Sequence, residues 1–448
     1  MNTMMIALVV VLVILLISIA IGGPIATTLG FTACIVTLLF LTTGHLSFLG
    51  TTMYSNAISA NNVIVPLFIM MAEFMAKGGI AEDLYYIMAK YLRKLKGGLA
   101  VATTLACTIF AALCGSSPAT AATIGKVSLD AMKKRGYKEH FAIGTVAGGG
   151  TLGIMIPPSI TLVMYGILTQ TSILKLLMAG ILPGLMLAGL MCASSIVRAN
   201  LNPELIGQKK RVKGQPKETV EQIEYEKYDT TFFEDFKKTG PALILIVVII
   251  GGMYSGLATA TECAGLGAIA AFLIVLAKMK MTKKIFGDAM MSTVKSSSMM
   301  ILMLSAALML TNVIGRLGIA SALAQLCTGF GINRWIVMIL LIVLWYFLGT
   351  IMSPTAMVTL TIPFVFTPLM QLGFDPIWLG IVSTLCVEVG MITPPVGNNL
   401  FILKQTTGLD MGTIIKGALP QIMTLTIGLV ILCVFPQIAT VVPSMMAK

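Results

Sequence analysis

Two stretches of the sequence place hydroxyl side chains and proline pairs inside apolar surroundings. The first runs from Cys114 to Pro158 and the second from Gly349 to Pro395. Each opens on a Ser-Pro pair and closes on a Pro-Pro pair. Proline has no backbone N–H, and its ring clashes with the carbonyl four residues back, so each pair should interrupt a helix and free carbonyl oxygens. Such oxygens bind small hard cations such as Na+ or Mg2+, and the N–H groups at helix starts suit a carboxylate.

The two stretches also share their spacing. Pro157 follows Pro118 by 39 positions, and Pro394 follows Pro354 by 40. A single proline in an apolar segment is an ordinary kink, whereas two matched pairs of breaks are a more specific signal. Interrupted helices at corresponding positions of two halves are typical of the binding site of a secondary transporter.

The candidate cation ligands are the oxygen atoms at the two breaks. At the first break they are the hydroxyls and carbonyls of Ser116 and Ser117 and the carbonyls of Gly153, Ile156 and Pro158. At the second break they belong to Thr350, Ser353, Thr355, Gly390, Met391, Thr393 and Pro395. The alternative is that these polar groups only cap the ends of broken helices.

Further polar residues flank the breaks. Glu388 lies one turn from the second break in an otherwise apolar stretch, and an intramembrane carboxylate is a candidate coupling group. The candidate substrate ligands are Ser117, Ser159, Thr355, Asn398 and Asn399. Asparagine amides can both donate and accept hydrogen bonds. The alternatives are a hydrogen-bonded structural glutamate and asparagines that join neighbouring helices.

The composition indicates a polytopic membrane protein. Of 448 residues, 57% are hydrophobic and 11% are charged, whereas soluble domains carry about 25% charged residues. The net charge of +12 could suggest nucleic acid, but no basic nucleic-acid-binding motif is present, and basic cytoplasmic loops account for the charge more simply. With only His45 and His140 present, neither a transition-metal cluster nor an organic cofactor is expected. Met1–Ala20 should be a first transmembrane helix rather than a signal peptide.

The apolar segments predict an all-α chain of two halves. In the first half (1–197), the expected elements are spans at Met5–Ile21, Ile25–Leu41, Val63–Met75 and Ile173–Ile196, a re-entrant hairpin over 99–132 and a broken helix over 141–169. The segment His45–Asn62 is expected to be polar. Ile80–Leu95 is amphipathic, and it is either a helix lying at the membrane surface or a connector outside the membrane.

A hydrophilic linker over 198–240 separates the halves, and its basic cluster Lys209–Arg211 fits the cytoplasm. The second half (241–448) repeats the order of the first. Its expected elements are spans at Ala242–Tyr254, Leu257–Leu276, Ser297–Ile314 and Met411–Val434, a hairpin over 335–370 and a broken helix over 377–403. The count of spans is expected to end at Val434.

If each broken helix is counted as one span, each half has five spans and one hairpin. Because five is an odd number, the second half must be inverted in the membrane relative to the first. Of the 30 Lys and Arg residues, only Lys175, Arg316, Arg334 and Lys448 then fall outside the cytoplasmic side. Such a bias is what the positive-inside rule demands. Both termini are expected to be periplasmic.

Seven motifs, in order, resemble one known family. They are GSSPATAATIG, MKKRGY, GTLGIMIPPS, AGILPG, GLATATE, GFDPIWLGI and EVGMITPPVGNNLF. Together they resemble the large membrane (DctM-type, M) subunit of tripartite ATP-independent periplasmic (TRAP) transporters, from about Gly22 to Phe401 with the linker outside the match. The resemblance implies the elevator-type architecture of the ion-transporter superfamily, Na+ coupling, a small four-helix membrane partner (Q-type) and a periplasmic substrate-binding protein (P-type).

The resemblance also implies site residues. The family's sodium positions fall on Cys114, Ser116, Gly153, Ile156 and Pro158, and the matching region of the second half would hold another ion. Two residues depart from the family pattern. Cys114 stands where serine is common, and Ser353 stands where many members carry an acidic residue.

The expected function is uptake of a small organic acid, such as a C4-dicarboxylate or a sugar acid like sialic acid, across a bacterial inner membrane. A stand-alone Na+- or H+-coupled carboxylate transporter of the same superfamily is the alternative. An ion channel is a further alternative. A membrane-embedded hydrolase is disfavoured, because HExxH, GxSxG and paired intramembrane aspartates are missing.

Overall fold

The computed structural model describes residues 2–41, 43–208, 231–329 and 333–446, and this part of the chain is helical and contains no strand. Seven of the described helices are long and apolar enough to cross a membrane. The chain is therefore an all-α polytopic membrane protein. The basic cluster Lys209–Arg211 of the predicted linker and Lys448 lie outside the described residues.

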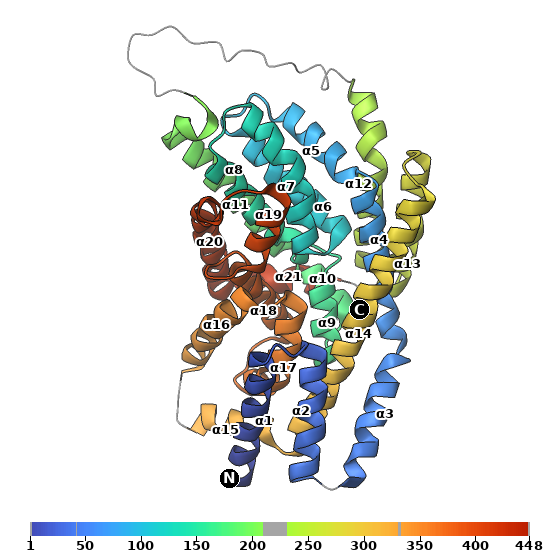
Figure 1. Ribbon diagram of the computed structural model, residues 1–448, viewed down its shortest axis with the longest axis vertical. Coiled ribbons are helices and arrows are strands. Elements are labelled where there is room, and N and C mark those ends of the chain that lie inside the picture. The colour runs from blue at the N-terminus through green and yellow to red at the C-terminus, as the bar shows by residue number, and fades with distance from the viewer. Residues whose placement is uncertain (1, 42, 209–230, 330–332, 447–448) are drawn as a thin grey trace.

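Figure 1 shows the helices of both halves, coloured and labelled in chain order. The first half contains α1 (Asn2–Ala20), α2 (Ile25–Phe40), α3 (Leu46–Ala57), α4 (Ile64–Lys77), α5 (Ile80–Tyr91), α6 (Gly98–Cys114), α7 (Ser117–Lys134), α8 (Glu139–Thr151), α9 (Ile160–Thr169), α10 (Ile173–Ala179) and α11 (Ile181–Leu201). The second half contains α12 (Phe232–Tyr254), α13 (Ala260–Ala277), α14 (Lys283–Arg316), α15 (Ile319–Gly329), α16 (Arg334–Ile351), α17 (Pro354–Gln371), α18 (Pro376–Met391), α19 (Asn398–Thr407), α20 (Met411–Val434) and α21 (Gln437–Met445).

Two segments are helical where no helix was predicted. The expected polar segment His45–Asn62 contains α3, which packs against α14, where the Asn56 side chain donates to the Ser305 hydroxyl at 2.8 Å. The chain also continues past Val434 into α21, which packs against α10 and α11. Neither helix is a candidate membrane span, and Met411–Val434 is the last such span in the described part of the chain. Contact with neighbouring helices, rather than mean apolarity, stabilises these short helices.

Two helices begin well before their apolar segments. α12 starts at Phe232 rather than Ala242, so the linker is shorter than the predicted 198–240. Its start is a capping box, in which the Thr231 hydroxyl accepts from the Glu234 backbone N–H and the Glu234 carboxylate accepts from the Thr231 N–H. α14 starts at Lys283 rather than Ser297. Its length, about 51 Å at 1.5 Å per residue, exceeds the roughly 30 Å hydrocarbon core, so a polar portion extends beyond it.

Both long apolar segments with Pro-Pro pairs are broken. α8 ends at Thr151, a 3-10 turn covers Leu152–Ile154, and α9 begins only at Ile160. In the second half, α18 ends at Met391 and α19 begins at Asn398. The proline pair lies in the gap each time, where it removes two backbone donors.

Contacts between a helix of the first half and a helix of the second half have counterparts in which the two corresponding helices come from the opposite halves. α9 packs against α17, and α19 packs against α7. Likewise α2 packs against α14, and α13 against α4. In Figure 1 the α6–α7 pair lies in the half of the molecule that holds α5, and the α16–α17 pair lies in the half that holds α15.

Each hairpin tip lies directly on the break of its own half, with glycine at the contact. A Cβ atom on Gly153 would lie 2.6 Å from the Ser116 carbonyl oxygen, and one on Gly390 would lie 2.6 Å from the Gly349 Cα. The Gly397 N–H donates to the Thr350 carbonyl at 2.8 Å. These distances leave no room for a side chain, so the glycines permit the backbone of each tip to touch the broken helix.

Two ion pairs hold the amphipathic helix α5 against the second half. Asp83 accepts from Lys278 of α13 at 2.6 Å, and Lys90 pairs with Asp235 of α12 at 2.5 Å. The Tyr91 hydroxyl also donates to Asp235, at 3.1 Å. α5 therefore packs along α12 and α13 rather than lying free.

Alanine at the two contact glycines should destabilise the fold. Gly153→Ala and Gly390→Ala each push a methyl group into backbone, which should lower the free energy of unfolding by about 1–3 kcal/mol. Gly189→Ala and Gly251→Ala are matched controls, because nothing lies within 4 Å of their added Cβ. Thermal unfolding in detergent should show lower midpoints for the first pair only. Equal midpoints for all four variants would show that the tips do not touch the breaks.

The buried ion pair should contribute more to stability than an exposed one. Asp235→Ala leaves Lys90 without its partner at side-chain exposures of 17% and 5%, which should cost on the order of 3 kcal/mol. The control is Glu139→Ala, whose pair with Lys133 is 73% and 47% exposed and should contribute less than about 1 kcal/mol. Thermal unfolding midpoints would compare the two. A loss for Asp235→Ala no greater than for Glu139→Ala would contradict the packing of α5.

Candidate functional site

Three polar side chains from both halves meet in the interior. The Ser117 hydroxyl, at the start of α7, donates to Glu388 Oε2 of α18 at 3.0 Å. The Asn399 side-chain amide, at the start of α19, donates to the same hydroxyl oxygen at 2.6 Å. All three residues are 0–1% exposed. The tip of the first hairpin is thus attached to the broken helix of the second half.

Two acceptor atoms of this cluster have no partner. Neither Glu388 Oε1 nor Asn399 Oδ1 has a hydrogen-bond partner, although both are buried. Within the described residues no lysine, arginine or histidine forms an ion pair with Glu388. Because an isolated buried carboxylate is very costly when charged, this group requires a compensating positive charge when it is ionised.

At the first break, several carbonyl oxygens accept no hydrogen bond from a backbone N–H group. The residue four positions after Gly153 is Pro157, which has no N–H, and the Ile156 N–H donates to Leu152 instead. Among the described residues, no donor reaches the carbonyls of Gly153, Ile156 or Pro158. The Pro158 carbonyl lies against the hairpin tip, because its oxygen would clash with a Cβ on Gly115.

The Ser159 side chain is engaged at the start of α9. Its hydroxyl donates to the Ile154 carbonyl at 2.5 Å and accepts from the Leu162 N–H at 3.3 Å. The side chain therefore caps α9 and satisfies a carbonyl that the proline pair leaves free.

The second break has the same layout without that cap. Met391 precedes Pro394 and Pro395 by three and four positions, so neither can donate to its carbonyl. Val396 occupies the position equivalent to Ser159 and has no hydroxyl. The Met391 carbonyl is consequently left without a donor among the described residues.

The remaining predicted ligands of the second break are partly occupied. The Gly390 carbonyl accepts from the Thr393 N–H at 2.9 Å, and the Thr350 carbonyl accepts from Gly397. The Thr350 and Thr393 hydroxyls donate to the carbonyls of their own helices. Ser353 precedes α17 without a side-chain capping bond, so its hydroxyl remains available.

The other predicted residues lie at the ends of the same helices. Cys114 is the buried last residue of α6, and Ser116 follows in extended conformation between the two hairpin helices. Thr355 lies in the first turn of α17, and Asn398 is the first residue of α19 and is half-buried. All are therefore within a turn of a hairpin tip or a break.

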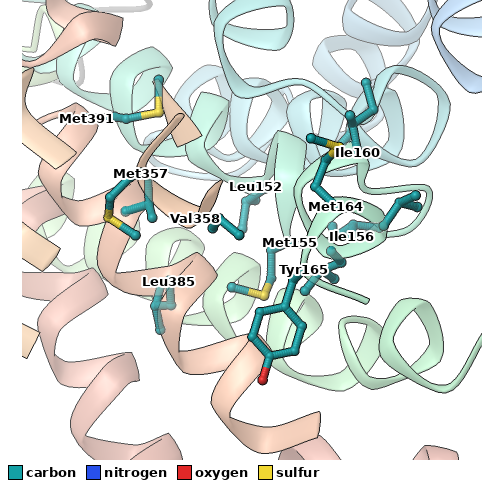
Figure 2. Close-up of a cluster of buried hydrophobic side chains, with 14 of the residues drawn as sticks. Leu152, Met155, Ile156, Ile160, Met164, Tyr165, Met357, Val358, Leu385 and Met391 are labelled. Carbon is teal, nitrogen blue, oxygen red and sulfur yellow. The ribbon is translucent and has the colours of Figure 1, made fainter. Parts of the chain in front are cut away.

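An apolar layer surrounds the breaks. Figure 2 shows Leu152 of the first break beside Val358 of α17, with Met155 and Ile156 of the break and Met357 of α17 in the same cluster. These side chains are buried and belong to one continuous core. Such packing excludes water and strengthens the polar contacts beside it.

The contact between Ser117 and Glu388 could not be inferred from the sequence pattern. Both residues were candidates, but for separate roles and in separate halves. The glycines at the contacts, Gly115, Gly349 and Gly397, were also not among the candidates. Their proximity to the Ser-Pro and Pro-Pro pairs is the signal that could have identified them.

Comparison with known proteins gives a consistent picture. The family model described as "Tripartite ATP-independent periplasmic transporter, DctM component" matches residues 12–438. The C4-dicarboxylate TRAP transporter large permease protein DctM of Pseudomonas aeruginosa is 34% identical over 381 residues, covering 85% of each chain. The sialic acid TRAP transporter large permease protein SiaM of Vibrio cholerae is 27% identical over 425 residues, covering 95% of each chain.

A solved structure shares the fold. The crystal structure of the Alcanivorax borkumensis YdaH transporter superposes with a TM-score of 0.62 at 16% sequence identity, covering 92% of this chain and 96% of that one. At that identity the likeness concerns the fold alone. The family match extends over nearly the whole chain, including both hairpins and both breaks. The chain therefore belongs to the DctM component family of tripartite ATP-independent periplasmic transporters, and it is a multi-pass membrane transport protein, not an enzyme.

Proposed function

We propose that this chain is the large permease subunit of a Na+-coupled importer that takes up a small organic acid delivered by a periplasmic binding protein. The observation that carries the proposal is the meeting of the two interrupted segments, where Ser117 of one half binds Glu388 and Asn399 of the other. Interrupted helices from two halves are where secondary transporters bind ions and substrate.

The donor atoms at the breaks fit a sodium ion. Hard monovalent and divalent cations prefer carbonyl, hydroxyl and carboxylate oxygens, and several such atoms at the breaks have no competing donor. The first ion would be held by oxygens of Ser116, Ser117, Gly153, Ile156 and Pro158, beside Cys114. The second would be held from among Thr350, Ser353, Thr355, Gly390, Met391, Thr393 and Pro395, with the free Met391 carbonyl the best placed. Bound sodium would neutralise the oxygen dipoles and let the breaks close around substrate.

Transport would follow an elevator mechanism. The hairpins and broken helices contact one another across the halves, as in the α9–α17 and α7–α19 pairs, which supports their movement as one body. The remaining spans would form the scaffold. The proposed inverted topology places the second half upside down relative to the first, in the bacterial inner membrane, with both termini periplasmic.

The substrate would be a carboxylate. Relatives are named for C4-dicarboxylates and for sialic acid, all of which carry carboxylate groups. The helix starts at Pro354 and Asn398 present backbone N–H groups that suit such an anion. Asn398 and Thr355 are the best-placed side chains, since Asn399 is engaged with Ser117 and Ser159 caps α9. The partners would be a small four-helix membrane subunit and a periplasmic binding protein.

Glu388 would be the coupling carboxylate. Its buried Oε1 has no hydrogen-bond partner, so the charged group needs a cation close by. The Ser117 hydroxyl that it holds forms part of the first proposed ion site. Binding of the ion and ionisation of the Glu388 carboxyl group would therefore be linked.

Uptake should require a sodium gradient and all three components. Proteoliposomes containing this chain and its small membrane subunit, supplied with the binding protein, should accumulate a radiolabelled organic acid only with an inward Na+ gradient. A K+ gradient of equal size is the control. Accumulation by this chain alone would support the stand-alone carboxylate transporter. Accumulation driven by a proton gradient without Na+ would contradict sodium coupling.

Neutralising Glu388 should impair transport without destabilising the protein. Glu388→Gln keeps the shape and an acceptor for Ser117 but removes the charge, so the initial uptake rate should fall at least about tenfold, the equivalent of about 1.4 kcal/mol. The thermal unfolding midpoint should be unchanged or higher, because burial of a charge is costly. Glu139→Gln, at an exposed carboxylate, is the control. Wild-type uptake by Glu388→Gln would exclude the coupling role.

A further inference from the structure

A cavity far from the two breaks lies between α5, α12 and α13. Its volume is about 870 Å³. It lies where the charged first turns of α12 meet the end of α13, at the limit of both membrane-spanning helices. The Asp83–Lys278 ion pair forms one wall and holds α5 in place.

One side of the cavity is positively charged. Lys237, Lys238, Lys278 and Lys280 line it, whereas its acidic residues are Asp83 and Glu234. Asp83 is engaged by Lys278, and Glu234 caps the start of α12. Within the described residues, Lys237, Lys238 and Lys280 form no ion pair. Three ammonium groups are thus available to an anion.

The other side of the cavity is apolar. It is lined by Pro241, Leu273, Ile274 and Ala277. The outward faces of the same two helices continue this surface with exposed Ile244 and Val247 of α12 and Leu266 and Ile269 of α13. Only 33% of the spanning window of each helix is buried in the protein. A ligand for this site therefore needs an anionic head and long apolar chains.

Aromatic residues mark the depth of the site. Phe232, Phe233 and Phe236 of the first turns of α12 are exposed. Helical segments that combine lysines with exposed phenylalanines are typical of the boundary between headgroups and acyl chains. Lys237 and Lys238 lie at the same level as these rings along α12, so their ammonium groups lie at headgroup depth.

We propose that this cavity binds an anionic phospholipid of the surrounding bilayer. Its phosphate would be held by Lys237, Lys238 and Lys280, and its acyl chains would run along the exposed faces of α12 and α13. Basic pockets between transmembrane helices bind such headgroups. The small membrane subunit is a less suitable occupant, since a protein covering the site would have to bury three unpaired lysines.

Native mass spectrometry of the full chain can test the proposal. Phosphatidylglycerol and phosphatidylcholine with identical acyl chains would be titrated onto wild type and onto the double variant Lys237→Gln/Lys238→Gln. Wild type should prefer phosphatidylglycerol, and the double variant should bind it on the order of tenfold more weakly. The control Lys283→Gln/Lys284→Gln removes the same charge from the exposed start of α14, outside the cavity, and should bind like wild type.

A second variant separates the cavity from charge alone. Ala277→Trp fills the apolar side without changing any charge and should also weaken phosphatidylglycerol binding. Equal binding of the two lipids, or equal losses in the cavity and control variants, would overturn the proposal. So would loss of lipid binding when the small membrane subunit is co-purified, because a protein would then cover the site. Displacement of the lipid by inorganic phosphate alone would likewise show that the apolar chains play no part.

Discussion

The arrangement of the site depends on one buried hydrogen-bonded cluster. Ser117, the first residue of a helix in one half, is held by Glu388 and Asn399 of the other half at 3.0 and 2.6 Å. Because a buried carboxylate tolerates few environments, this contact fixes the first hairpin tip relative to the second broken helix. The glycine contacts bring the hairpin tip of each half against the broken helix of the same half.

The two breaks are alike in backbone and different in side chains. Each combines a Pro-Pro gap with a hairpin tip packed on glycine, but Ser159 caps the carbonyl of Ile154, whereas Val396 leaves that of Met391 free. Cys114 and Ser353 add to the asymmetry. If the two breaks hold ions as proposed, the two sites would accordingly differ in their oxygen ligands.

The breaks and the hairpins could be predicted from the sequence because proline removes a backbone donor in any tertiary context. The contact of Ser117 with Glu388 could not, since the two residues are 271 positions apart and neither segment specifies its distant partner. The capping role of Ser159 depends on the path of the loop, which composition does not reveal. The helix α3 and the early start of α12 were missed because hydropathy detects the apolar part of a helix, although Thr231 and Glu234 at the start of α12 carry a readable capping box.

The most direct test of the central claim is an experimental density map of the full chain in lipid nanodiscs with sodium chloride. The account predicts the bases of the two hairpins at opposite membrane surfaces, and the Ser117 hydroxyl within hydrogen-bonding distance of Glu388 and Asn399. Hairpin bases at the same surface would contradict it. So would uninterrupted helices through Pro157 and Pro394, or a Ser117 side chain remote from Glu388.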